Sequence, residues 1–113
     1  MWVDSSKIVP EVPKAIEGSP ATGDIKIKRL CHGENVLLLW EEEKKGAKAG
    51  LHKHQHESAF ILLEGRRKMN IAGREHIFEK GHAWLIKPGV EHDHEALEDC
   101  KFIEAKSPPQ ITW

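Results

Sequence analysis

The sequence has no long apolar run and almost no net charge. No stretch approaches the ~20 consecutive apolar residues that a membrane-spanning helix needs, and the opening MWVDSSKIVPEV lacks the apolar core of a signal peptide. We therefore expect a soluble, cytoplasmic protein. The 17 basic and 18 acidic side chains leave a formal charge of −1. No overall electrostatic field would attract nucleic acid or an anionic membrane. Small molecules or other proteins are therefore the binding partners that we expect.

Cysteine is also scarce. Cys31 and Cys100 lack the close spacing of a zinc-binding or redox pair and are too few for a disulfide scaffold. We expect two reduced thiols in or near the core. At 113 residues the chain fits one domain, and hence one site.

Short apolar segments separated by glycine and proline make up most of the chain. Residues 1–23 contain three prolines and two glycines without a sustained period, so we expect an extended N-terminal arm. Residues 24–113 have period-two or continuous apolar spacing, which predicts an all-β sandwich or barrel with a tight hairpin at Ala72-Gly73. The predicted strands are 24–30, 35–42, 51–56, 59–64, 66–71, 74–79, 83–86 and 101–105.

Two charged stretches are predicted to lie on the surface. The mixed signs of residues 41–45, just before Gly46, are typical of a solvated turn. Arg66, Arg67 and Lys68 alternate along a predicted strand, and we expect them to face solvent, with one of them lining the mouth of the barrel as the alternative.

The histidines are concentrated in two short segments, which indicates a chemical role. Five of the eight histidines fall within residues 52–56 and 92–94. Side chains of a β-strand alternate between its faces, so His52, His54 and His56 would point the same way, with neighbours ~6.5–7 Å apart.

A metal site needs one more ligand from a distant segment. His92 follows the Pro88-Gly89 turn, which would set the direction of its ring. We therefore predict one divalent metal ion held by His52, His54 and His92.

These spacings resemble a known family. The patterns Gly46-x5-His52-x-His54 and Gly81-x6-Pro88-Gly89-x2-His92 closely match the two motifs of the cupin superfamily. The resemblance covers about residues 24–109 and implies a single-domain cupin jelly-roll β-barrel. The stretches LHKHQHESAFILLEG, GHAWLIKPGVEH and ALEDCKFIEAKSPP look most like the small pectin-degradation cupins that linearise unsaturated uronates into 5-keto-4-deoxyuronates.

The fourth metal ligand that the resemblance implies is missing. Cupins of this type carry Glu or Gln four or five residues after the second histidine, where this chain has Ser58 and Ala59. The shell could be completed by water, by His56, or by a strand bulge that turns Glu57 inward. We favour three histidines and water, and retain Ser58 as a candidate because it occupies the ligand position.

The donor set also bears on the identity of the metal. Imidazole-rich, oxygen-poor coordination favours Zn, Ni or Fe, with Mn or Cu as further options. Three neutral imidazoles leave the double charge of the ion undiminished, which makes it a stronger Lewis acid.

Further site residues follow from the resemblance. The uronate-linearising cupins place an acid, an aromatic and an arginine on and after the last strand, and alignment through SerProPro at 107–109 puts Glu104, Lys106 and Gln110 there. Glu104 could move a proton beside the metal. Lys106 would offer a point charge if it faces the pocket. His94 either orients a ligand and shuttles a proton or is solvated. Glu104 and His94 are therefore the candidate catalytic residues.

Three functions are compatible with such a site. The first is a metal-dependent isomerase or lyase that acts on a small sugar acid or a similar polar metabolite, in carbohydrate metabolism. The second is an Fe-dependent dioxygenase, and the third is a non-catalytic domain that binds or senses a small ligand. Fold alone does not choose between them.

The arm suggests an assembly state. Residues 1–23, with Trp2 and Val3, could cross to a second subunit and add a strand to an open sheet edge. We expect a homodimer.

Overall fold

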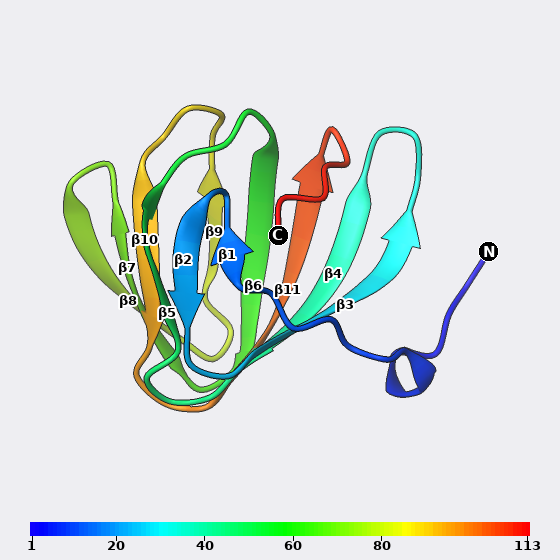
Figure 1. Ribbon diagram of the computed structural model, residues 1–113, viewed down its shortest axis with the longest axis horizontal. Helices are drawn as coiled ribbons and strands as arrows, with labels where there is room; N and C mark the ends of the chain where they lie inside the picture. The colour runs from blue at the N-terminus through cyan, green and yellow to red at the C-terminus, as the bar shows by residue number, and fades with distance from the viewer.

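Antiparallel strands make up nearly all of the regular structure in the computed structural model, which describes residues 1–113 (Figure 1). The one helical element is the 3-10 turn η1 (Ser5–Lys7), and no helix is long and apolar enough to cross a membrane. The strands are β1 (Ala15–Ile16), β2 (Ser19–Thr22), β3 (Ile25–His32), β4 (Leu37–Glu43), β5 (Lys48–His52), β6 (Glu57–Glu64), β7 (Arg66–Ile71), β8 (Arg74–Glu79), β9 (Ala83–Ile86), β10 (His92–Ala96) and β11 (Cys100–Ser107).

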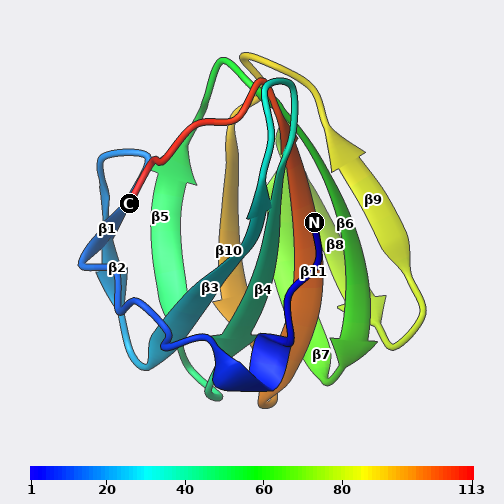
Figure 2. The same ribbon diagram turned by 90° about the vertical axis from the view of Figure 1, so that its right-hand side faces the viewer.

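The strands form two sheets that face each other. One sheet has the order β1-β2-β5-β10-β7-β8, and the other has the order β3-β4-β11-β6-β9. Figure 1 shows β7, β10 and β5 on one side with β4 and β3 on the other, and Figure 2 shows the same arrangement turned by a quarter. Strands far apart in the sequence are neighbours in both sheets, as in a jelly roll. The predicted jelly-roll β-barrel is confirmed.

Alternation along the strands decides which residues fill the barrel. In β4 every second residue from Leu37 to Glu43 is buried, and β11 shows the same alternation from Cys100. Because neighbouring side chains on a strand point to opposite faces, Leu37, Leu39 and Phe102 meet in the core. Cys31 and Cys100 are free thiols, as expected.

The β7–β8 hairpin has the predicted strand bounds and turn. Ile71 pairs with Arg74, which leaves Ala72 and Gly73 as a two-residue connection. Both turn residues have positive φ, 51° and 81°. Two positive φ values characterise the turn whose twist matches that of the flanking strands, so the hairpin prediction is confirmed.

Several charged residues that we expected at the surface lie inside the barrel. Glu41 and Glu43 are buried because β4 continues to Glu43 and its alternation carries them inward. Arg67 is buried in β7, where its Nε donates to Glu43 Oε1 at 2.9 Å and its guanidinium lies over the Phe102 ring. The surface predictions were wrong for these three residues. Arg67 and Glu43 pair with each other inside the barrel, and burial raises the pKa of Glu41, which favours its uncharged form.

The sheet begins earlier than the sequence predicted. Ala21 and Thr22 of β2 pair with β5, so part of the expected arm over residues 1–23 belongs to the barrel. The β1–β2 hairpin escaped prediction because two very short strands leave no apolar period to detect.

The histidine-rich segment is not one continuous strand. β5 ends at His52, and residues 53–56 form a loop instead of the expected strand over 51–56. Backbone groups of this loop bond outside the ladder, because the His54 carbonyl accepts from the Gly89 N–H at 2.8 Å. Burial still alternates, with His54 and His56 inside and Lys53 exposed.

The first residues run along the outside of β3 and leave apolar surface exposed. Glu11 bridges to Ile27 of β3, while Trp2, Val9 and Val12 are exposed. The homodimer stays a prediction, and these side chains are the apolar surface that it would cover.

Gly65, in the β6–β7 turn, allows a direct test of the packing at the closed end of the barrel. Its φ is +91°, and a Cβ there would overlap the Asp99 carbonyl oxygen, whereas Gly73 has φ +81° and open space around it. We expect Gly73→Ala to cost about 1–2 kcal/mol from backbone conformation alone, and Gly65→Ala to cost at least about 3 kcal/mol because overlap is added. Urea unfolding measures both, and equal losses would contradict the close approach.

Candidate metal centre and ligand pocket

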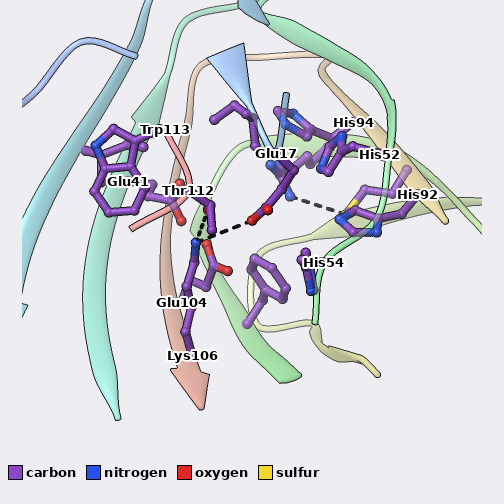
Figure 3. A pocket seen from close by; sticks show the side chains of 15 residues that line it. Glu17, Glu41, His52, His54, His92, His94, Glu104, Lys106, Thr112 and Trp113 are labelled. Atoms are coloured by element: carbon purple, nitrogen blue, oxygen red, sulfur yellow. Dashed lines mark hydrogen bonds and ion pairs between the residues drawn. The ribbon is translucent and has the colours of Figure 1, made fainter. Parts of the chain in front are cut away.

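One pocket inside the barrel contains five of the six sequence-predicted site residues (Figure 3). Its volume is about 430 Å³ with the open mouth included. In Figure 3 the histidines lie on one side, while Glu104 and Lys106 lie on the other. The lining residues are Ile16, Glu17, Ile27, Glu41, His52, His54, Phe60, Arg67, Met69, His92, His94, Glu104, Lys106, Thr112 and Trp113.

Strand pairing brings the three predicted metal ligands together. His52 and His92 are opposite each other in the β5–β10 pair, and their ring centroids lie 4.3 Å apart with planes at 67°. The His54 ring, from the loop after β5, lies 4.8 Å from that of His92 at 69°. The Gly89 N–H···O=C His54 bond ties this loop to the Pro-Gly turn, which explains how distant segments converge.

The same three rings are oriented by backbone carbonyls. His52, His54 and His92 donate from Nδ1 at 2.6, 2.7 and 2.9 Å. The acceptors, in the same order, are the carbonyls of Gly50, His56 and Val90. A carbonyl oxygen can only accept, so each Nδ1 carries a proton, and in the neutral form of each ring Nε2 keeps its lone pair. This is the tautomer in which an imidazole binds a metal through Nε2.

The protonation state suits a metal as well. Burial lowers the pKa of His52 and His92 to about 4, although the backbone hydrogen bonds act in the opposite direction. Both rings are therefore neutral at pH 7, the form that coordinates metal without first releasing a proton. The donor set fits the divalent ion that the sequence predicts.

A second group of donor atoms lies close by but is poorly arranged for an ion. Ligand atoms of Glu17, His54 and His56 all lie within 4.8 Å of one another. The rings of His54 and His56 are stacked, with centroids 3.8 Å apart and planes at 9°. An ion ~2.0–2.1 Å from one nitrogen in its ring plane would lie far outside the plane of the other ring. As placed, His56 packs against His54, and the two stacked rings are not arranged to share one ion.

The structure places the remaining fourth-ligand candidates away from the three rings. Ser58 is fully buried in β6, donates from Oγ to Glu104 Oε2 at 2.7 Å, and is not among the lining residues. Glu57 is exposed. Neither side chain is brought to His52, His54 and His92, which leaves water as the completion that these positions favour.

Glu104 faces the pocket from β11. Its carboxylate is 7% exposed and accepts the hydrogen bond from Ser58. Burial raises its pKa, but the Lys106 charge and hydrogen bonds outweigh burial and hold the pKa of Glu104 below its usual range. An ionised carboxylate in this place can accept a proton from a ligand.

Lys106 also faces the pocket, the condition on which its predicted role depends. Its Nζ donates to Thr112 Oγ1 at 2.7 Å and lies 3.8 Å from Glu17 Oε1. The ammonium also lies 5.1 Å from the centroid of the Trp113 ring. A lysine that is 4% exposed thus puts a positive charge opposite the histidines.

His94 is buried beside the three predicted metal ligands. Its Nδ1 lies 3.2 Å from Glu43 Oε2, and its ring centroid lies 6.0 Å from that of His52. Burial alone would raise the pKa of Glu43, but the charges of Arg67 and His94 lower it to about 2. The alternative of a solvated His94 was wrong, whereas its catalytic role stays a prediction.

Sequence reasoning missed the residues that close the mouth of the pocket. Glu17 lies in the β1–β2 turn, and its N–H donates to the Thr112 carbonyl at 2.9 Å. Trp113 packs against the core from the segment after β11. Neither segment has a strand period, and nothing in the sequence indicates that residues 17 and 112 are neighbours. Gln110 accepts from His56 Nδ1 at 3.1 Å and anchors the same segment.

The comparisons with known proteins agree with this fold. A family model described as the cupin domain matches residues 39–105, more than half of the chain, and the chain therefore belongs to the cupin family. No curated protein matches the sequence.

Solved structures are similar over most of their lengths. An RmlC-like cupin from Shewanella frigidimarina has a TM-score of 0.84 and 19% identity, covering 96% of this chain and 91% of its own. A predicted oxalate decarboxylase from Thermotoga maritima has a TM-score of 0.82 and 23% identity, and the match covers 95% of this chain and 98% of the other. KdgF from Halomonas sp. has a TM-score of 0.73 and 23% identity, and the match covers 76% of this chain and 80% of the other. At these identities the likeness shows the fold alone.

The buried histidines predict a specific pH dependence for the metal-free protein. The pKa of His52 is about 4 when folded and about 6.5 when unfolded, so the unfolded state binds more protons as pH falls through this window. His52 therefore removes stability between pH 6.5 and 5. We expect His52→Gln to lose less stability over this range than the wild type, as measured by urea unfolding. Exposed His76→Gln should follow the wild type, and parallel profiles for all three proteins would contradict the burial argument.

Proposed function

We propose that this cupin is a metal-dependent isomerase or lyase that acts on a small sugar acid, such as a uronate, or on a similar polar metabolite. One observation carries the proposal: three imidazoles whose Nδ1 atoms donate to backbone carbonyls face a buried lysine and an ionised carboxylate across one pocket. A pocket with a few convergent polar groups and shifted pKa values is typical of a small-molecule site.

The histidine side would hold one divalent transition metal ion. His52, His54 and His92 would supply three nitrogen ligands, with water completing the shell. Zn, Ni and Fe match this donor set best. When bound, the ion supplies Lewis acidity toward an oxygen atom of the ligand.

The opposite side of the pocket, with Lys106 and Glu104, would bind the sugar acid and exchange a proton with it. Lys106 has three donors and uses one on Thr112, so its ammonium can attract the carboxylate of the ligand. As a point charge it orients a carboxylate less strictly than the paired donors of an arginine would. Glu104, ionised and accessible from the pocket, can take a proton from the ligand. The motif resemblance to uronate-linearising cupins supports the sugar-acid class.

The metal can be tested without knowledge of the substrate. We expect tag-free protein to contain about one divalent transition metal ion per chain by elemental mass spectrometry. The double variant His52→Ala/His92→Ala should lose the ion because it removes two of three ligands. The matched double variant His76→Ala/His82→Ala changes two exposed histidines and should retain it. Loss of the ion in His56→Ala with retention in His52→Ala/His92→Ala would assign the metal to the stacked pair instead.

Turnover tests the reaction class. We expect an unsaturated uronate to be converted to its linear keto product, as followed by NMR, with the rate lost on chelation and reduced about 100-fold or more in Glu104→Gln, which cannot accept the proton. Glu42→Gln, an outward-facing change on β4, should retain the rate. A raised melting temperature with the uronate but no product would favour a non-catalytic binding domain, and oxygen uptake dependent on Fe(II) would favour a dioxygenase.

A further inference from the structure

Glu41 is one of three carboxyl groups that line the pocket, with Glu17 and Glu104, and no role has been assigned to it so far. Phe102 of β11 lies opposite Glu41 of β4, so Glu104 is the diagonal neighbour of Glu41 on the inner face. Glu41 and Glu104 are 6% and 7% exposed, and both line the pocket. Ser58 donates to Glu104, whereas no other residue donates to Glu41, whose own hydrogen-bond partner is the Glu104 carboxylate.

Their surroundings shift the pKa values of the two carboxyl groups in opposite directions. Burial and the neighbouring Glu104 charge raise the pKa of Glu41 well above its usual value, against the opposing charges of Arg67 and Lys106. The charge of Glu104 is instead stabilised by Lys106 and by hydrogen bonds from Glu41 and Ser58, while Glu17 faces it from the β1–β2 turn. Two adjacent carboxylates in a low-dielectric interior do not both ionise, so the pair keeps one proton.

We infer that Glu41 and Glu104, which line the same pocket, form a one-proton carboxyl pair in which Glu41 carries the proton and is the acid of the pocket, while Glu104 is the base. This inference rests on the proposed function and narrows it. The ligand must present an oxygen acceptor to Glu41 and an acidic O–H or C–H group to Glu104. A hydroxy or keto sugar acid carries both groups.

The pair has the proton balance of an isomerisation. Glu104 takes a proton from an O–H or C–H bond of the ligand, and the electron pair of that bond stays on the ligand. The O–H bond of Glu41 breaks, and its proton forms a new O–H or C–H bond elsewhere on the same ligand. The ligand keeps its composition, and transfer of the proton from Glu104 back to Glu41 restores the pair. No oxidant or reductant is needed.

Infrared spectroscopy of the metal-free protein tests the shared proton independently of turnover. At pH 7 we expect the carbonyl stretch of a protonated carboxylic acid in the wild type. The band should be absent in Glu41→Gln and in the apolar Glu41→Leu, and present in Glu42→Gln on the same strand. Absence of the band in the wild type, or its survival in either Glu41 variant, would overturn the inference.

Ligand affinity tests the donor role. Galacturonate, a saturated uronate, is titrated calorimetrically into zinc-loaded protein. We expect Glu41→Gln, which keeps an N–H donor, to bind within about threefold of the wild type, and Glu41→Leu to bind about tenfold more weakly. Equal affinities, or no binding to any of the three proteins, would remove the donor role. Absence of zinc binding together with an intact infrared band would contradict the proposed function while supporting the carboxyl pair.

Discussion

Three hydrogen bonds from histidine Nδ1 atoms to backbone carbonyls are the interactions on which the site depends. His52, His54 and His92 each bond to a carbonyl two residues away, so the local backbone sets the direction of each ring. A free imidazole could present either nitrogen, and it would lose entropy on binding an ion. Here the orientation is fixed before an ion arrives. The loop over residues 53–56 contributes because it leaves the strand ladder, which frees the His56 carbonyl to accept from His54.

Buried charge is the second constraint, and the barrel places it at two separate positions. Arg67 and Glu43 pair beneath Phe102, and Lys106 lies near Glu104 at the mouth. A buried ion needs a partner, because its desolvation costs several kcal/mol. His52, His54 and His92 line the same pocket as Glu104 and Lys106. The acid–base side chains and the predicted metal-binding histidines can therefore face one bound small molecule without neutralising one another's charge.

Much of this arrangement could be predicted from residues close together in the sequence. Period-two segments and turn residues predicted most of the strands, and the spacing of His52, His54 and His92 predicted a convergence that the ring distances now describe. What could not be predicted depends on long-range pairing. Glu41 and Arg67 are charged residues of the kind that usually lies on the surface. Only the β4–β11 and β7–β10 registers turn them inward. Glu17 and Thr112 meet through a single backbone hydrogen bond between segments without any period.

Membership of the cupin family accounts for the fold but leaves the chemistry to individual side chains. The central claim is that three imidazoles, fixed as Nδ1–H tautomers, present Nε2 to one ion. NMR of protein labelled with 15N in the histidine rings, titrated with zinc, tests it most directly. The account predicts that the Nε2 signals of His52, His54 and His92 shift together and saturate at one equivalent, while their Nδ1 atoms stay protonated and His56 keeps its signals. Coordination through Nδ1, or a shift of His56 Nε2 in place of His52 and His92, would contradict it.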